Sequence, residues 1–251
     1  MAPPPRLSFE ELAAKLATDG PVKQEPAKRR VRGLLDGRWI FDTLDAVFVW
    51  EHPYFPFFYV PFNAVSSSLA DNGAAYQDAA NGYHLFSLRV SSKTVMAVHF
   101  LRGPLQGLVK IPYGELDAWY VEDEKLLGSH PKDPYKRIEC LPSSRRVVVR
   151  MKSNEAILAS STNNVFLHET GLPARYYLSP TSIISLDCLV PSETKTMCPY
   201  KGEARYYHLQ VGNQRIEDAI WYYPYPTAES MAIQNRLCFY DDKVDIRIES
   251  T

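Results

Sequence analysis

The sequence predicts a mainly β fold made of two tandem antiparallel β units with short helices. Its apolar runs are short, rich in β-branched and aromatic residues, and separated by Gly, Asn, Ser or Pro, which is typical of antiparallel strands and their turns. Tyrosine (16) and proline (19) are abundant, and these residues favour strands, sheet edges and turns. The third observation is an internal repeat, in which short segments recur in the same order after about 116 to 121 residues.

The repeat consists of segment pairs that keep one order along the chain. The pairs are 29–32 with 145–148, 47–51 with 165–169, 57–60 with 175–178, 86–90 with 207–211, and 118–120 with 238–240. Because so many ordered matches are not expected by chance, each copy should be one fold unit of about 110 residues, an ordinary domain size.

The predicted organisation has four parts. These are an N-terminal extension over 1–27, a first unit over 28–120, a linker over 121–143 and a second unit over 144–251. The extension starts with a proline-rich stretch, 1–7, that we expect to be disordered, and its residues 21–27 resemble a linker because they hold two prolines. The linker over 121–143 is rich in charge and proline.

Three short elements have clear sequence signals. Ser8 and Glu11 form a capping box that begins a short helix. The dipeptide 212–213, Gly-Asn, supplies the positive φ that a tight hairpin turn needs. A second short helix is expected after Thr227, which would cap it, with Met231 on the inner face of that helix.

Composition argues against several classes of protein. The net charge is −1, so a polyanionic partner such as nucleic acid and a membrane surface are not expected. We expect no membrane span and no signal peptide, and therefore a cytoplasmic protein with reduced thiols. The four cysteines and six histidines lack the paired spacing of metal ligands, so neither a metal nor a cofactor is predicted. The sequence does not predict an oligomeric state.

The second copy carries a polar motif that the first copy lacks. It runs over 194–204 and contains Cys198, Tyr200 and Lys201, whereas the first copy has small and polar residues over 69–82 without Cys or Lys. When the two copies are aligned, Asp218 corresponds to Ala97, Trp221 to Phe100 and Arg175 to Phe57. Polar groups that only one copy holds are candidates for function, and the alternative is drift in one copy.

The turn around Pro199 is the first candidate for chemistry. It would bring the thiol of Cys198 and the ammonium of Lys201 to the same side, where the cation would stabilise a thiolate. Cys198 is therefore a candidate nucleophile, and the alternative is a small buried thiol packed under a turn. Lys201 is a candidate for binding a carboxylate or phosphate, or for a Schiff base if desolvated, and the alternative is a solvated turn lysine.

Two carboxylates are the next candidates. Glu169 shares a strand face with Val165 and Leu167, so it needs a basic partner, and the first copy repeats this pattern with Glu51. Because both copies keep this glutamate, a structural role is favoured over a general acid or base. Asp218 lies between two isoleucines on one predicted strand face, which makes it a candidate catalytic carboxylate or a structural one.

Four further residues are candidates for binding a ligand. Arg175 would contact an anion with two hydrogen bonds, while Tyr177, Tyr200 and Trp221 would offer ring faces for stacking. The alternative for all four is ordinary packing in an aromatic core.

Four strings of the second copy resemble the signature of domain-of-unknown-function family 427. They are 175–177, 196–204, 217–224 and 239–245. The resemblance covers residues 144–248, whereas the first copy matches only in its strand skeleton and is a degenerate copy. It implies compact β domains of a tent-like kind, in which two sheets meet at an angle over a pocket. The family has no assigned function, so the resemblance implies a fold and a site but no reaction.

The leading hypothesis from the sequence is a protein that binds a small molecule in a pocket of the second unit. An Arg and a Lys close together favour an anionic or carbonyl-bearing ligand, and cofactor-independent acid–base or covalent catalysis would fit these groups if the protein is an enzyme. One alternative is a non-catalytic binding module that recognises a peptide or a modified side chain through an aromatic pocket. A purely structural interaction protein is the third reading.

Overall fold

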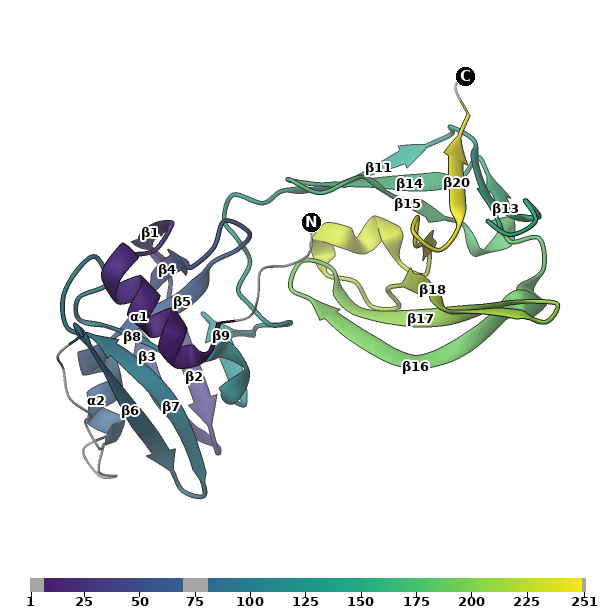
Figure 1. The fold of residues 1–251 in the computed structure, drawn as a ribbon. Coiled ribbons are helices and arrows are strands. Elements are labelled where there is room, and N and C mark those ends of the chain that lie inside the picture. The colour runs from purple at the N-terminus through teal and green to yellow at the C-terminus, as the bar shows by residue number, and fades with distance from the viewer. Residues whose placement is uncertain (1–6, 70–80, 250–251) are drawn as a thin grey trace. The chain divides into compact units, whose positions relative to one another are not determined.

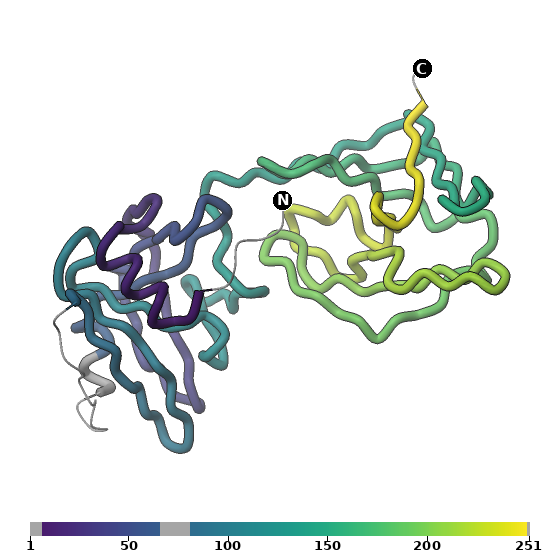
Figure 2. The backbone as a smooth tube through the Cα atoms, viewed as in Figure 1, coloured from purple at the N-terminus to yellow at the C-terminus, as the bar shows by residue number. Residues whose placement is uncertain are grey.

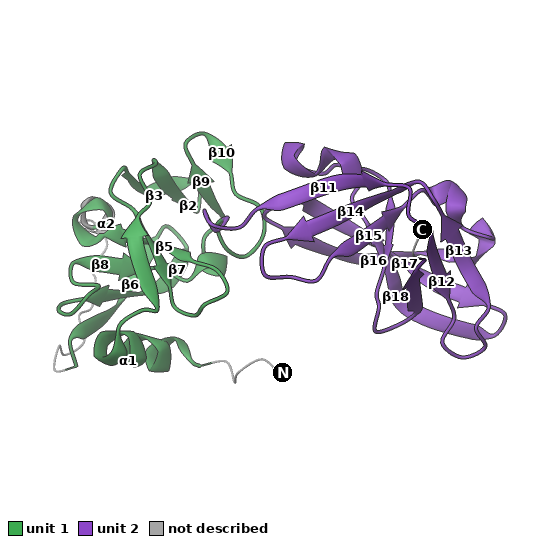
Figure 3. Ribbon diagram, turned by 90° about the horizontal axis from the view of Figure 1, so that it is seen from above, with its two compact units in different colours: residues 1–131 green, residues 132–251 purple. Residues whose placement is uncertain are grey.

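The predicted mainly β fold is confirmed. The computed structural model describes residues 7–69 and 81–249, and 50% of the chain is strand against 13% helix. The chain divides into two compact units, unit 1 over Met1–Pro131 and unit 2 over Lys132–Thr251 (Figure 3). The proline-rich start, 1–6, and most of the segment 69–82 lie outside the described residues.

The described residues of unit 1 form two antiparallel sheets, two α-helices and a short 3-10 helix (Figure 1). The six-stranded sheet has the order β1 (Lys23–Pro26), β4 (Val47–Trp50), β5 (Phe57–Pro61), β8 (Leu108–Lys110), β7 (Lys93–Phe100) and β6 (Tyr83–Val90). The four-stranded sheet has the order β10 (Glu124–Lys125), β9 (Ala118–Val121), β2 (Val31–Leu35) and β3 (Arg38–Thr43). The helices are α1 (Phe9–Asp19), α2 (Phe62–Leu69) and η1 (Tyr113–Glu115).

Unit 2 also contains two antiparallel sheets, here with three short 3-10 helices. The seven-stranded sheet has the order β11 (Ile138–Ser143), β14 (Asn164–Glu169), β15 (Arg175–Leu178), β19 (Leu237–Phe239), β18 (Gln214–Tyr222), β17 (Gly202–Val211) and β16 (Leu189–Cys198). The three-stranded sheet has the order β13 (Ile157–Ser161), β12 (Val147–Arg150) and β20 (Asp245–Ile248). The 3-10 helices are η2 (Pro180–Ser182), η3 (Leu186–Cys188) and η4 (Ala228–Ile233).

The two units repeat one strand order. In the large sheets, β1-β4-β5-β8-β7-β6 corresponds to β11-β14-β15-β19-β18-β17, and in the small sheets β9-β2-β3 corresponds to β20-β12-β13. One of the predicted segment pairs, 118–120 with 238–240, was wrong. Residues 118–120 lie on β9, whose counterpart in unit 2 is β20. Residues 238–240 begin on β19, whose counterpart in unit 1 is β8. Within the described residues, β16 has no counterpart in unit 1.

Each large sheet has two buried faces. In unit 1 one face packs against the small sheet, where Phe58 and Phe86 meet Val31 in one apolar cluster. The opposite face carries Tyr59 and is covered by α1, since Ala13 and Leu16 of that helix belong to the same cluster as Tyr59, Val49 and Val98. The N-terminal helix is therefore part of the core of unit 1 and not an appendage.

Both segments predicted as linkers contain strands, so those predictions were wrong. Residues 23–26 form β1, which pairs with β4, and residues 138–143 form β11, which pairs with β14. β1 and β11 are edge strands, and an edge strand tolerates a proline such as Pro26 or Pro142 because one side of its backbone needs no partner. The prolines that suggested linkers mark sheet edges instead.

The predicted short elements were confirmed in part. Ser8 and Glu11 form the capping box of α1, and the Gly-Asn turn closes the β17–β18 hairpin with Val211 opposite Gln214. The helix after Thr227 is the 3-10 helix η4, which Thr227 does not cap through its side chain. Met231 is 52% exposed while Ile233 is buried, because a 3-10 helix has three residues per turn and turns a different side inward.

Removing the side chain of Leu16 tests whether α1 is part of the core. Leu16 is 1% exposed, so we expect Leu16→Ala to lower the stability of unit 1 by about 2–5 kcal/mol through lost burial and a cavity. Amide hydrogen exchange in β4 and β5 reports this change separately from unit 2. Lys15→Ala, at an exposed position of the same helix, is the matched control, and equal protection in both variants would show that α1 does not stabilise the sheet.

Candidate functional site

A row of side chains crosses the middle of the seven-stranded sheet of unit 2. The register pairs Val165 with Tyr177, Tyr177 with Cys238, Cys238 with Trp221, and Trp221 with Tyr206. Cross-strand partners point to the same face of a sheet, so these five side chains form one surface. The indole Nε1 of Trp221 donates a hydrogen bond of 3.1 Å to the hydroxyl of Tyr177, which satisfies both buried polar groups.

Tyr177, Trp221 and Tyr206 of this row are the floor of a cavity of about 220 Å³, which we call the aromatic pocket. Its aromatic lining consists of Tyr177, Tyr206, Trp221, Tyr223 and Tyr240. Three charged side chains also line the pocket, namely Glu169, Arg175 and Lys201. Cations and a carboxylate beside ring faces in one small cavity are the usual makeup of a ligand site.

Glu169 and Lys201 form a buried ion pair in the wall of the pocket. Their Oε2 and Nζ atoms are 2.5 Å apart, and only 7% of the Glu169 side chain and 13% of the Lys201 side chain are exposed. Glu169 ends β14 on the same face as Leu167, as the strand period predicts. Lys201 lies in the turn between β16 and β17, where Cys198 pairs with Gly202.

Gly202 gives the turn its shape. Its φ is +99°, a region that side chains disfavour, and a Cβ at this position would lie 3.0 Å from the carbonyl oxygen of Tyr225. The close approach of the Tyr225 backbone therefore requires glycine, and the turn that results directs Lys201 toward Glu169.

Arg175 is the second cation of the pocket and is held from two directions. Its Nη1 lies 3.1 Å from Oδ1 of Asp241, and its Cζ lies 5.6 Å from the ring centroid of Trp221. Burial acts to raise the pKa of Asp241, but the hydrogen bond and charge of Arg175 outweigh burial and lower that pKa. The guanidinium is thus oriented before any ligand binds.

Unit 1 also buries a glutamate beside a lysine. Lys110 contacts Glu51, whose Oε1 also accepts a 3.0 Å hydrogen bond from Tyr59. Burial lowers the pKa of Lys110, and the opposing effect of Glu51 is smaller. The expectation that only the second copy gathers charged groups was therefore wrong, because unit 1 supplies its lysine from β8 and not from the segment that was compared.

The row in unit 1 shows what differs between the two sheets. Its members are Val47, Tyr59, Lys110, Val98 and Leu85, in the places of Val165, Tyr177, Cys238, Trp221 and Tyr206. Trp221 therefore corresponds to Val98 and not, as the sequence comparison had it, to Phe100. Phe57 stands in the place of Arg175, as predicted. Phe57 pairs with Val49 of β4, and Arg175 pairs with Leu167 at the equivalent position of β14.

Three predicted site residues, Cys198, Tyr200 and Asp218, lie outside the lining of the pocket. Cys198 is partly buried against the apolar cluster that includes the pocket floor, and its thiol makes no hydrogen bond or ion pair within the described chain. The ammonium of Lys201 bonds to Glu169. Tyr200 is 4% exposed, and its hydroxyl accepts a 2.6 Å hydrogen bond from the backbone of Asp133.

Asp218 belongs to a different part of unit 2. It lies in β18 beside His208 of β17, and its carboxylate bonds to Ser192 and Thr194 of β16. A strand rises about 3.3 Å per residue and Thr194 precedes Cys198 by four positions on β16, so Asp218 is roughly 13 Å from Cys198. The predicted single site of Cys198, Lys201 and Asp218 was therefore wrong.

A β-bulge explains why the sequence comparison misplaced Asp218. Tyr207 pairs with Ile220 and Leu209 pairs with Ile216, so β18 holds extra residues opposite His208. In unit 1 the hairpin has no such shift, and Ala97 corresponds to Ile220. Asp218 has φ +45°, a conformation in which aspartate is several-fold enriched over most other residues, and it has no counterpart in unit 1.

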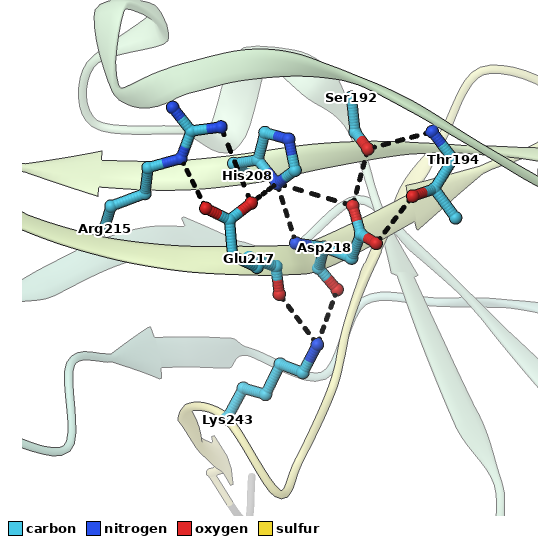
Figure 4. A network of polar contacts seen from close by, with 7 residues as sticks. All are labelled: Ser192, Thr194, His208, Arg215, Glu217, Asp218 and Lys243. Atoms are coloured by element: carbon cyan, nitrogen blue, oxygen red, sulfur yellow. Dashed lines mark hydrogen bonds and ion pairs between the residues drawn. The ribbon is translucent and has the colours of Figure 1, made fainter.

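The bulge carries a polar network (Figure 4). The carboxylate of Asp218 accepts hydrogen bonds from Ser192 Oγ at 2.6 Å and Thr194 Oγ1 at 2.8 Å. His208 Nδ1 lies 3.0 Å from the backbone nitrogen of Asp218 and 2.5 Å from Oε2 of Glu217. Burial acts to raise the pKa of Asp218, but the Ser192 and Thr194 hydroxyls, with the charges of His208 and Lys243, lower it overall.

Several residues of the aromatic pocket and of the polar network were not predicted from the sequence. Tyr223 follows Trp221 by two positions, so the strand period could have placed both on one face. Tyr240 is part of a string that the family resemblance already contained. Thr194 lies in the polar motif, but Ser192 and His208 gave no signal, because only the irregular pairing of β16 and β18 brings them to Asp218.

Other places in the molecule offer less chemistry. A larger cavity of about 330 Å³ lies beside the β17–β18 turn, but its lining is mostly apolar, with Asp187 as its one charged member. In 7–69 and 81–249, no cluster of His, Cys, Asp and Glu is suited to a metal ion. No helix in these ranges is long and apolar enough to cross a membrane.

Fold and site together define a β protein of two similar units, one of which holds a small aromatic pocket with charged groups. The family model described as "Domain of unknown function (DUF427)" matches residues 23–96 and 139–250, so the chain belongs to this family. The match includes most of unit 1 as well as unit 2. No curated protein matches the chain.

The ion pair in the pocket wall predicts a specific pattern of stability. Lys201→Met leaves the carboxylate of Glu169 buried without a cation, so we expect unit 2 to lose about 3–5 kcal/mol. The double variant Glu169→Gln with Lys201→Met removes the charge as well, and we expect it to recover most of that loss. Hydrogen exchange in β14 and β17 measures both effects, with exposed Lys195→Met as the control. Additive losses in the double variant would contradict the pairing.

The polar network predicts a pH-dependent contribution from Asp218. Its pKa in the folded chain is below the ordinary 3.8, so the stabilisation is complete above that value and disappears as the pH falls through the lowered pKa. We therefore expect Asp218→Asn to cost most at neutral pH and least below pH of about 3. Asparagine also tolerates positive φ, so the bulge should persist. Unfolding curves between these pH values test the prediction, and exposed Asp242→Asn should leave them unchanged.

Proposed function

We propose that unit 2 binds a small anionic or carbonyl-bearing compound in the aromatic pocket. The observation that carries the proposal is that Arg175, Lys201 and the buried carboxylate of Glu169 surround one cavity with aromatic walls. An arginine binds a carboxylate or phosphate with two parallel hydrogen bonds, which fixes both the position and the orientation of the ligand.

The size of the pocket supports a small ligand. Its volume of about 220 Å³ is below the roughly 300 Å³ at which pockets for drug-sized compounds begin. The rings of Tyr177 and Trp221 meet edge to face at 86°, so they offer a flat wall and an edge to the ligand. A compact planar compound with one charged end matches both the volume and these surfaces.

Unit 1 supports the assignment of the function to unit 2. The corresponding face of unit 1 is covered by α1 and has Phe57 where unit 2 has Arg175. Val98 replaces Trp221, and Lys110 occupies the place of Cys238. Each replacement removes a polar or aromatic contact or fills the space in which a ligand would lie.

Catalysis, if the pocket performs it, would use Glu169 and Lys201 as acid and base without a cofactor. Both groups reach the cavity, and each is within hydrogen-bonding distance of the other, as proton transfer requires. Cys198 is not part of this proposal, because its side chain is not among those that line the pocket.

The alternative function is recognition of a modified, positively charged side chain by the aromatic rings. Five such rings around one cavity favour it, since aromatic faces attract cations. A cation bound among these rings would be stabilised by a free carboxylate, but Glu169 is already paired with Lys201. Arg175 would also repel a cation. An anionic ligand therefore fits the charges better.

Fluorescence of Trp221 tests the proposed function. Unit 2 contains no other tryptophan, so Trp221→Phe identifies its share of the signal. We expect small carboxylates to change this signal. Arg175→Phe introduces the residue that unit 1 has at the equivalent position. We expect it to weaken the binding of these carboxylates about 10- to 100-fold, because a charged hydrogen bond is lost. Arg247→Gln, on β20 outside the pocket, is the matched control.

Two results would reject the proposal. One is that no carboxylate or phosphate in a panel of small compounds changes the Trp221 signal. The other is that Arg175→Phe and Arg247→Gln bind such a compound equally well. A response to trimethylammonium compounds, in place of anions, would favour the alternative function.

A further inference from the structure

We propose that Lys201 is a nucleophilic lysine that forms an imine with small 2-oxo acids, whose carboxylate Arg175 binds. The inference rests on the proposed function and deepens it, because it names the class of ligand and the atom that reacts. It depends on the placement of one amine, one carboxylate and one guanidinium around a single small cavity.

The amine of Lys201 is placed for attack on a ligand in the pocket. It is one of the side chains that line the cavity, and only 13% of it is exposed, so water competes little for its nitrogen. A lysine is activated as a nucleophile by desolvation and by a nearby cation, and Arg175 supplies that cation in the same pocket. Lys195 is exposed, so it lacks the desolvation that activates Lys201.

Glu169 is the base that frees the amine. Its Oε2 lies 2.5 Å from Nζ of Lys201, which is within the distance needed for direct proton transfer. With 7% of its side chain exposed, this carboxylate has no closer competitor for the proton than the lysine itself. A proton can therefore pass directly between the two groups with no bridging water molecule.

Arg175 selects the acid among carbonyl compounds. Its guanidinium contacts Asp241, whose side chain is 63% exposed, so an incoming carboxylate can replace that partner at little cost. A compound anchored at Arg175 and reacting at Lys201 must carry its carbonyl close to its carboxylate, because the cavity measures only about 220 Å³. Small 2-oxo acids have this arrangement.

The reaction balances with the groups present. Glu169 takes one proton from the ammonium of Lys201, and the resulting amine attacks the carbonyl carbon. The nitrogen then passes one proton to the former carbonyl oxygen, which gives a neutral carbinolamine. Glu169 returns its proton to that hydroxyl, the C–O bond breaks and water leaves. Ammonium and ketone have become a protonated imine and one water, with no oxidant or reductant required.

Lys110 is an internal comparison within the same chain. It is paired with Glu51 as Lys201 is paired with Glu169, and its side chain is 8% exposed. It packs over the rings of Phe57 and Tyr59, and α1 covers that face of the sheet. Lys110 therefore has the carboxylate, but among the described residues it lies on a covered face with Phe57 in the place of Arg175, and it should not react.

Reductive trapping on the full chain tests the inference. Pyruvate is added with sodium cyanoborohydride, which reduces an imine to a stable amine, and peptides are then mapped by mass spectrometry. We expect Lys201 to carry the mass of pyruvate less one oxygen atom, while Lys110 and Lys195 stay unmodified. Lys201→Arg should lose this adduct yet keep the positive charge beside Glu169. The control Lys195→Arg should still form the adduct on Lys201.

Trp221 fluorescence with pyruvate and lactate separates the two proposals, since lactate lacks the carbonyl. Binding of both compounds without an adduct on Lys201 would overturn the imine and leave the proposed function intact. Adducts spread evenly over exposed lysines would overturn it as well. If neither compound nor any other small anion binds, the proposed function and the inference both fail. An adduct on Lys201 that Arg175→Phe abolishes supports the inference fully.

Discussion

The carboxylate that folding buries at the end of β14 is the constraint from which the rest of unit 2 follows. A charge at this depth is tolerated only with a partner, and Lys201 provides it at 2.5 Å. To reach that position, the β16–β17 turn must approach the backbone of Tyr225 closely enough that only Gly202 fits. One buried charge therefore determines where the turn lies, and with it the wall of the aromatic pocket. Figure 2 traces the backbone of the β16–β17 turn, in which Gly202 pairs with Pro226.

Both units pair a buried glutamate with a lysine, but the lysine comes from a different element in each unit. In unit 1 the cation is Lys110 of β8, which lies in the sheet itself and fills the space beside Tyr59. In unit 2 the cation comes from a turn, so the corresponding place in the sheet is left to the small side chain of Cys238. The corresponding face of unit 1 is covered by α1, whose Ala13 and Leu16 pack against Tyr59.

The sequence predicted the fold better than the site, for physical reasons that differ from residue to residue. The alternation of apolar and polar residues and the turn residues are local features of the sequence. The β class, the capping box of Ser8 and the Gly212 turn could therefore be predicted. Prolines mark edges as well as linkers, and only the partner strand decides which, so β11 was missed. Lys110 could not be found because it meets Glu51 across strands that are far apart in sequence.

The misplacement of Asp218 shows why a repeat alone cannot align a site. Extra residues in β16 and in β18 fall on both sides of β17, next to Tyr206 and His208. Asp218 joins these two irregular segments through Ser192 and Thr194, so it stabilises the bend without facing the pocket. Beyond the bend the register is regular again, with Tyr206 opposite Trp221. A polar residue found in only one copy can therefore mark an irregular pairing of strands in that copy, which here ties Asp218 to Ser192 and Thr194.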